Sequence, residues 1–161
     1  MATISPERAQ SGYVLDGNEG EAFWLLGMLE TVKISGEDTG GQYGLLEVVA
    51  PEGVGSPWHV HAEEDEWFYV LEGEMSVWVA DTRHTLTAGS FAFGPKGVPH
   101  TFYAEAGGVR ALVGFAPGAC FLRARSPSST CSTPSSSATP ASRCAGTTCS
   151  SSSRKPPTAS R

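Results

Sequence analysis

Two histidines separated by one residue are the first side chains in this sequence that could do chemistry. They are His59 and His61, in the stretch PWHVHAEEDEWFYVLEG of residues 57–73, and four consecutive acids follow at residues 63–66. On an extended strand, positions i and i+2 face the same side and their Cα atoms lie about 6.6 Å apart. Two imidazoles at that spacing can reach one ion, at about 2.0–2.1 Å for a metal such as zinc. The alternative interpretation is an ordinary charged loop that faces solvent.

Glu66 is the acid whose position argues for coordination. It begins an apolar run, and strand alternation places it on the same face as Phe68 and Val70. A buried carboxylate is costly unless it is paired or bound to a metal. We therefore expect Glu66 to be a ligand that a turn at residues 62–65 brings beside the histidines, across an antiparallel pair. The acids before it are expected to be solvated turn residues, any of which is an alternative ligand: Glu63, Glu64 and Asp65.

A third histidine follows a predicted turn in the stretch GSFAFGPKGVPH of residues 89–100. Phe91 and Phe93 are predicted to alternate into the core, and residues 94–97 to make a tight turn. His100 then stands at the start of the next apolar run. It completes a candidate set of four metal ligands, which are His59, His61, Glu66 and His100. The remaining histidine, His84, lies in the polar stretch DTRH and is expected to be an exposed loop residue.

The elements that must position these ligands are short strands. From residue 22 to residue 117, apolar runs rich in β-branched and aromatic residues are broken by Gly and Pro every eight to twelve residues. This pattern predicts an all-β sandwich or barrel. In FYVLEGEMSV, residues 68–77, a hairpin is predicted to turn at Glu72-Gly73. A helix over residues 21–31 is an alternative for the first run, and the aromatic side chains are expected mainly in the core.

The chain divides into three segments by composition. Residues 1–20 are polar and Gly-rich and are predicted to be an N-terminal arm, and residues 21–118 form the predicted β-barrel domain. Residues 119–161 are rich in Ser, Thr and Pro and are predicted to be a disordered tail, since they hold few large apolar residues after Leu122. Because acids vanish there and periodicity stops abruptly, a frameshifted reading of the gene is an alternative origin. All four cysteines lie in this segment, in no zinc-site spacing, so a thiolate site is excluded in the barrel.

The distribution of charge along the chain restricts which partners the protein is expected to bind. All 17 acidic residues lie at or before Glu105, and residues 1–119 have a net charge near −12. Such an acidic domain argues against binding to nucleic acid or to anionic membranes. The chain has neither a long apolar span nor a recognisable signal sequence, so we expect a cytoplasmic protein.

The two histidine stretches resemble the two sequence motifs of the cupin superfamily. The first motif, G-x5-H-x-H-x3,4-E-x6-G, is matched at Gly53, His59, His61, Glu66 and Gly73. The second, G-x5-P-x-G-x2-H-x3-N, is matched at Gly89, Pro95, Gly97 and His100, whereas its last position is Ala104. The resemblance covers roughly residues 40–115. It implies a jelly-roll β-barrel that binds one divalent metal through the three histidines and Glu66, and it implies homodimers. Ala104 is not at a ligand position, so this departure concerns strand geometry.

The resemblance extends to function through the flank of residues 36–75, which is similar to bacterial cupins of the quercetin dioxygenase-like kind. This implies a metal-dependent dioxygenase of a small aromatic or enolic molecule, with Glu66 as both ligand and catalytic proton acceptor. Nitrogen and oxygen ligands suit Fe, Mn, Ni, Co, Cu or Zn, and dioxygen is the implied second substrate. The alternatives are a non-catalytic cupin that binds a small ligand, and a metal-dependent isomerase or epimerase.

Overall fold

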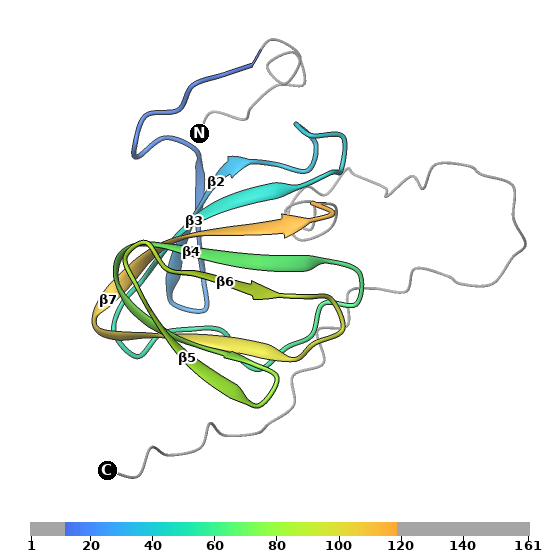
Figure 1. The fold of residues 1–161 in the computed structure, drawn as a ribbon. Coiled ribbons are helices and arrows are strands. Elements are labelled where there is room, and N and C mark those ends of the chain that lie inside the picture. The colour runs from blue at the N-terminus through green and yellow to red at the C-terminus, as the bar shows by residue number, and fades with distance from the viewer. Residues whose placement is uncertain (1–11, 119–161) are drawn as a thin grey trace, which may run out of the picture.

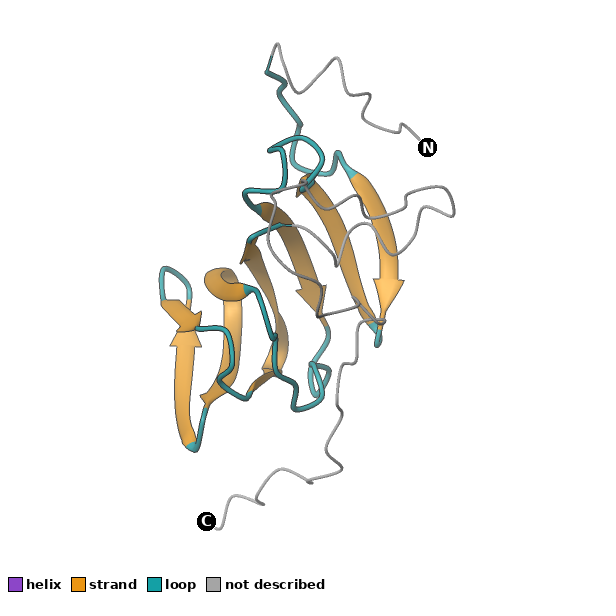
Figure 2. Cartoon of the chain, turned by 90° about the vertical axis from the view of Figure 1, so that its right-hand side faces the viewer, coloured by secondary structure: helices purple, strands orange, loops and turns teal. Residues whose placement is uncertain are grey.

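The computed structural model describes residues 12–118, and in these residues it contains seven strands and no helix (Figures 1 and 2). The strands are β1 (Glu21–Leu25), β2 (Met28–Ile34), β3 (Gly44–Ala50), β4 (Asp65–Val79), β5 (Thr82–Thr87), β6 (Phe91–Gly94) and β7 (His100–Ala116). The predicted tail of residues 119–161 with its cysteines, and residues 1–11 of the predicted arm, lie outside the described residues. No helix that could cross a membrane is found within residues 12–118.

The strands form one antiparallel sheet in two parts. Their order is β1-β2-β3-β7-β4-β5, and β6 pairs with β4. The long strands β4 and β7 pair from Asp65 opposite Ala116 to Val79 opposite His100. β6 borders the first half of β4, and β5 borders its second half. Because β4 and β7 run through both parts of the sheet, these two strands join the parts. Figure 1 shows these parts as an upper and a lower layer, connected on the left by the curve of β7. The predicted all-β fold is confirmed.

One hydrophobic core contains side chains from both parts of the sheet. Its large members include Leu46, Phe68, Val70, Met75 and Val77, each at most 1% exposed. Fully burying side chains of this kind stabilises a fold by about 1.5–3 kcal/mol each. Alternation along β4 is as predicted, because Glu66, Phe68 and Val70 face inward and are 4%, 1% and 0% exposed.

The predicted hairpin at Glu72-Gly73 is wrong, because β4 continues through this point. The pairing of β4 with β7 shifts register on both sides, between Val70 and Glu72 and between Gly73 and Met75. Gly73 has φ of 79°, and a Cβ there would lie 2.1 Å from the carbonyl oxygen of Gly108. Gly73 therefore serves a β-bulge where the backbone of β7 approaches closely, and a glycine at a bulge resembles a glycine in a turn when only the sequence is read.

The alternative of a helix over residues 21–31 is also wrong. β1 and β2 form a hairpin in which Leu25 pairs with Met28. The two residues of its loop, Leu26 and Gly27, have φ of 52° and 87°. Positive φ at both loop residues matches the right-handed twist of the flanking strands, so this local geometry favours the hairpin.

The prediction that Phe91 and Phe93 point into the core is wrong, since they are 60% and 49% exposed. Alternation along β6 is present, but its phase is reversed. Gly94 faces inward, where a Cβ would lie 3.2 Å from the His100 ring, and Ala92 packs against the core. Tyr69 of β4, opposite Phe91, is likewise 42% exposed, so the aromatic side chains are not mainly in the core here.

Candidate metal centre

The four predicted ligands come together at one end of the two long strands. Glu66 is the second residue of β4, and His100 is the first residue of β7. His59 and His61 lie in the loop between β3 and β4, where His59 forms an isolated antiparallel bridge with His100. The His59 N–H donates to the His100 carbonyl at 3.1 Å, and the His100 N–H donates back at 3.0 Å. The predicted pairing of Glu66 with the histidine segment is wrong, because Glu66 pairs with Gly94 and Phe115.

Three imidazole nitrogens converge on a single carboxylate oxygen. Oε2 of Glu66 lies 2.7 Å from Nε2 of His100, 3.1 Å from Nε2 of His61 and 3.5 Å from Nε2 of His59. The four possible ligand atoms all lie within 4.8 Å of one another. The rings of His59 and His100 meet edge-on, with their centroids 4.4 Å apart. The set His59, His61, Glu66 and His100 can therefore hold a metal ion.

The other nitrogen of each imidazole is held by an acceptor. Nδ1 of His59 lies 2.8 Å from the Pro57 carbonyl oxygen, and Nδ1 of His100 lies 2.9 Å from the Val98 carbonyl oxygen. A carbonyl can only accept, so these Nδ1 atoms carry hydrogen and Nε2 is turned toward Glu66. Such contacts fix the tautomer and orientation of metal-binding histidines. In both histidines, Nδ1 contacts the carbonyl oxygen of the residue two positions earlier, so each of these contacts is local in sequence.

His61 is oriented by a carboxylate instead. Its Nδ1 lies 3.2 Å from Oε2 of Glu64, whose side chain is 14% exposed. Hydrogen bonds to Glu64 and Glu66 raise the pKa of His61 to about 9, against the lowering effect of burial. The prediction that Glu64 is a solvated turn residue is therefore wrong.

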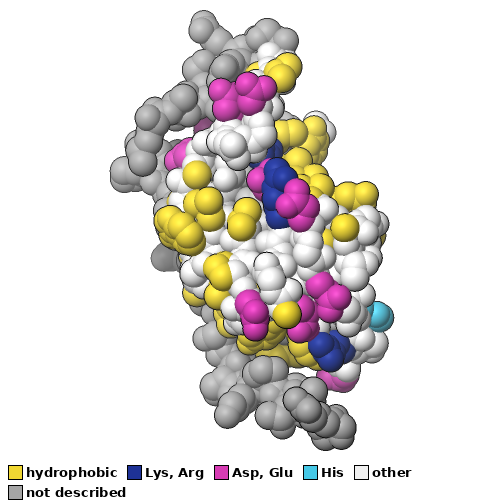
Figure 3. Space-filling view, turned by 90° about the vertical axis from the view of Figure 1, so that its left-hand side faces the viewer, with side chains coloured by type: hydrophobic (Ala, Val, Ile, Leu, Met, Phe, Trp, Pro, Cys, Tyr) yellow, Lys and Arg dark blue, Asp and Glu magenta, His cyan; other side chains and the backbone are white. Residues whose placement is uncertain are grey.

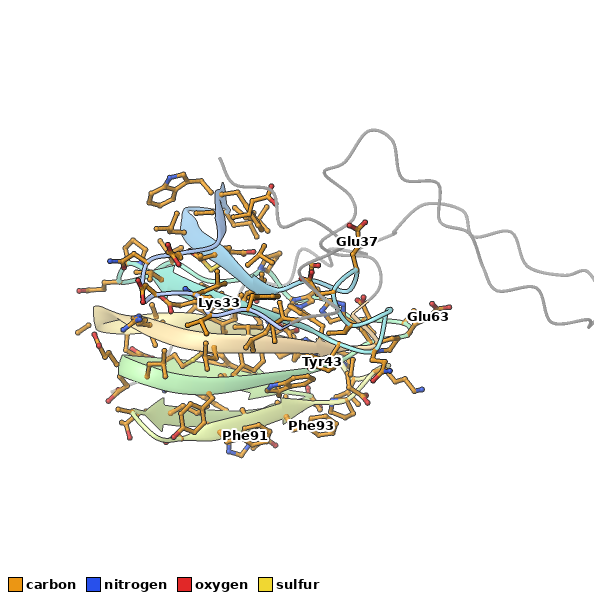
Figure 4. The ribbon with its side chains drawn as sticks, turned by 90° about the horizontal axis from the view of Figure 1, so that it is seen from above. Lys33, Glu37, Tyr43, Glu63, Phe91 and Phe93 are labelled. Carbon is orange, nitrogen blue, oxygen red and sulfur yellow. The ribbon has the colours of Figure 1, made fainter. Side chains whose placement is uncertain are left out.

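The neighbouring acids take different roles. Glu63 is exposed and points away from the strands in Figure 4, as predicted. Asp65 begins β4 instead of ending a turn, and its Oδ1 accepts a hydrogen bond from the Lys96 N–H at 2.9 Å. The Gly97 N–H donates to the His61 carbonyl at 2.8 Å. These two bonds fasten the loop that carries His61 to the loop that leads to His100.

Burial differs across the site. The side chain of His100 is fully buried and that of Glu66 is 5% exposed, whereas His59 and His61 are 11% and 15% exposed. Burial alone would raise the pKa of Glu66, but hydrogen bonds from His100, His59 and His61 outweigh it and hold that pKa well below its usual range. Glu66 is therefore charged, and the site meets solvent on the side of His59 and His61.

Gly94 is a further contributor that sequence reasoning missed. A Cβ at this position would lie 3.2–3.4 Å from three atoms of the His100 ring. The missing side chain therefore leaves the space into which the fully buried imidazole packs. The sequence holds no separate signal for this, because Gly94 stands at an undefined position of the second motif.

His84 takes no part in the site. It is exposed as predicted, but it lies within β5, opposite Val77, and not in a loop.

The matching family agrees with this architecture. Residues 45–115 match the cupin domain family. The antiparallel sheet and the positions of His59, His61, Glu66 and His100 agree with this match, so residues 45–115 form a domain of the cupin superfamily.

The individual proteins that this chain resembles share less than a third of their aligned residues with it. Quercetin 2,3-dioxygenase from Bacillus subtilis (strain 168) is 28% identical over 102 residues, which are 63% of this chain and 30% of that enzyme. The chain thus spans less than a third of the length of this relative. Two solved structures share the fold over 66% of this chain. KdgF from Halomonas sp. has a TM-score of 0.59, 18% identity and 94% of its own length covered. An RmlC-like cupin from Shewanella frigidimarina has a TM-score of 0.56, 22% identity and 91% covered.

Proposed function

We propose that this chain is a metal-binding cupin in which His59, His61, Glu66 and His100 hold one divalent transition metal ion. The contacts of the imidazoles carry this proposal. Each histidine has an acceptor at Nδ1 and the Glu66 carboxylate at Nε2. A neutral imidazole has one N–H, so it can donate to only one of them. To serve both acceptors with protons, all three rings would have to be charged in a buried site.

One divalent ion would satisfy these nitrogen and oxygen atoms better than protonation of all three imidazole rings would. It would take the lone pairs of three neutral imidazoles and one carboxylate, which leaves a single net positive charge. Ligand atoms about 2.1 Å from a common ion lie up to about 4.2 Å apart, so the observed spread within 4.8 Å needs only small adjustments. Nitrogen and oxygen donors of this kind suit Fe, Mn, Ni, Co, Cu or Zn.

We further propose that the reaction is the dioxygenation of a small aromatic or enolic molecule. The similarity to the Bacillus subtilis quercetin 2,3-dioxygenase supports this reaction class. When bound, the ion supplies a Lewis acid for a substrate oxygen and a centre for dioxygen chemistry. Small substrates reach it from the side of His59 and His61, where the ligand side chains are partly exposed.

In this proposal the three histidines and Glu66 have different roles. His59, His61 and His100 are held in place by their Nδ1 contacts, so the site is set before substrate arrives. Glu66 is the carboxylate that contacts all three, and we assign it the acceptance of the proton from the substrate hydroxyl. A metal ion held by these residues would make the substrate hydroxyl a stronger acid, so a weakly basic carboxylate would suffice.

Oxygen uptake by the full chain is the direct test. The protein is stripped with a chelator, loaded separately with each candidate metal, and assayed with a panel of flavonols and related enols under air and under nitrogen. We expect oxygen consumption with at least one metal, its loss in Glu66→Gln, and its retention in Glu63→Gln. Tight metal binding without turnover across the panel would reject the dioxygenase and favour a binding-only cupin. Isomerisation of a substrate under nitrogen would favour the isomerase alternative.

A further inference from the structure

Asp65 stands directly before the proposed ligand Glu66, but its side chain lies on the other face of β4. Side chains alternate along a strand, so Glu66 points into the core and Asp65 points outward. Asp65 is accordingly not among the four residues whose ligand atoms lie within 4.8 Å of one another. Its Oδ1 accepts a hydrogen bond at 2.9 Å from the Lys96 N–H, in the β6–β7 loop (residues 95–99). Asp65 therefore contacts a neighbouring loop and not the centre of the site.

The β6–β7 loop uses all of its backbone donors. Its first and last residues are prolines, which have no N–H, so three donors remain. The Lys96 N–H donates to Asp65, and the Gly97 N–H donates to the His61 carbonyl at 2.8 Å. The Val98 N–H donates to a carbonyl within the loop at 3.1 Å. Two successive amides of the loop therefore hold the two ends of the turn that separates His61 from Asp65.

The same loop sets the position of two proposed ligands. The Gly97 N–H holds the backbone of His61, and the Val98 carbonyl oxygen lies 2.9 Å from Nδ1 of His100. Contacts of the second kind orient the ring of a metal-binding histidine. Gly97 has φ of 77°, a left-handed conformation that favours glycine, so the loop follows a specific path between these two contacts. A displacement of the loop would therefore move both histidines.

We propose that Asp65 is a positioning residue of the metal centre, an inference that rests on the metal-binding function proposed for His59, His61, Glu66 and His100. The Asp65 carboxylate holds the β6–β7 loop in the conformation that presents two of these histidines to the ion. It acts through the position of its acceptor oxygen and not through its charge. Loss of an outer partner that orients metal ligands typically costs about 10–100-fold in metal affinity.

The charge of Asp65 contributes little because it is one of many and is partly in water. The chain has 17 acidic residues, and Figure 3 shows acidic side chains at several separate places on one face of the molecule. Asp65 is half-buried, so solvent and salt screen its charge. Removal of this charge alone would change the attraction of a cation only slightly, whereas removal of the oxygen would leave the Lys96 N–H without its acceptor.

Metal affinities of variants of the full chain separate the acceptor oxygen from the charge. Each protein is stripped with a chelator and titrated with Co²⁺ against a competing dye. Asp65→Asn keeps an oxygen in the same place but loses the charge, so it should bind the ion like the wild type. Asp65→Glu keeps the charge but moves the oxygen by one methylene, and Asp65→Ala lacks the oxygen. Both of these variants should bind about tenfold or more weakly.

Glu63→Ala is the matched control. Glu63 is an exposed acid two residues before Asp65, so this variant removes the same charge from the same turn. It should keep the affinity of the wild type. Circular dichroism shows which of the variants fold, and if Asp65→Ala does not, the comparison of Asp65→Asn with Asp65→Glu still decides.

Two further measurements distinguish positioning of the ligands from a general loss of stability. The visible absorption spectrum of the cobalt-loaded protein at saturating metal reports the geometry of the ligands. This spectrum should change in Asp65→Ala and stay unchanged in Asp65→Asn. Amide hydrogen exchange at Lys96 and Gly97 should likewise become faster in Asp65→Ala and not in Asp65→Asn.

The results that would overturn the inference differ from those that would overturn metal binding itself. Wild-type affinity in Asp65→Glu together with weak binding by Asp65→Asn would show that the charge matters and the acceptor does not. Wild-type affinity and an unchanged spectrum in Asp65→Ala would show that Asp65 positions nothing. Either result leaves the proposed metal centre intact, whereas a wild-type chain that binds no metal would overturn both proposals.

Discussion

Nε2 of His100 lies 2.7 Å from Oε2 of Glu66, and both side chains are buried. This contact joins the start of β7 to the start of β4, which are 34 residues apart in the chain. A buried carboxylate is tolerated only where a positive charge or several donors compensate it. The same pair of residues therefore links the starts of the two long strands and lies at the centre of the candidate site.

Removal of His100 should abolish stoichiometric metal binding. His100→Ala deletes the fully buried member of the proposed ligand set, whereas His84→Ala deletes an exposed imidazole that lies outside the site. Plasma mass spectrometry should find about one equivalent of a transition metal in the wild type and in His84→Ala, and almost none in His100→Ala. Equal metal content in the two variants would contradict the assignment.

The apparent metal affinity should rise with pH. An ion and a proton compete for Nε2 of a histidine. Glu64 and Glu66 raise the pKa of His61 to about 9, so at neutral pH a proton must leave before the ion binds. Between pH 7 and that pKa we expect roughly a tenfold gain in affinity per pH unit, followed by a plateau. Competition titrations with a metal-sensitive dye measure this.

Glu64→Gln is the matched test of the pH effect. It removes the carboxylate whose hydrogen bond is the largest cause of the raised pKa of His61. The plateau in affinity should therefore begin at a lower pH. A plateau that does not move would show that Glu64 has no influence on His61.

The convergence of His59, His61 and Glu66 could be predicted from sequence because it depends on short spacings. His59 and His61 are two residues apart, and Glu66 shares the inward phase of Phe68 and Val70. Because side chains alternate between the two faces of a strand, such short spacings determine which residues share a face.

Contacts between distant segments could not be predicted in this way. The phase of β6 brings Gly94 against the His100 ring, a contact that a Phe-Ala-Phe pattern does not encode. Gly73 marks a close approach of β7, although a glycine after a glutamate reads equally well as a turn. Glu64 meets His61 because of the loop conformation, which the spacing of charges leaves open.

A methyl group at position 94 should weaken the metal site without unfolding the protein. The Cβ of Gly94→Ala would lie 3.2 Å from Nδ1 of His100 and displace the ring by a few tenths of an ångström. Changes that disturb the orientation of a ligand typically cost about 10–100-fold in metal affinity. Gly17→Ala is the control, because nothing lies within 4 Å of a Cβ there. Unchanged metal affinity in Gly94→Ala would mean that the His100 ring can accommodate the added methyl group.

Two phenylalanine truncations should separate the core from the outer face of the sheet. Phe68 is 1% exposed and Phe91 is 60% exposed. Phe68→Ala removes a buried ring and leaves a cavity, so it should lower the free energy of unfolding by about 3–5 kcal/mol. Phe91→Ala should lower it by less than about 1 kcal/mol, because the ring is already largely in water. Urea denaturation followed by tryptophan fluorescence measures both values. A comparable loss in the two variants would mean that Phe91 packs inward after all.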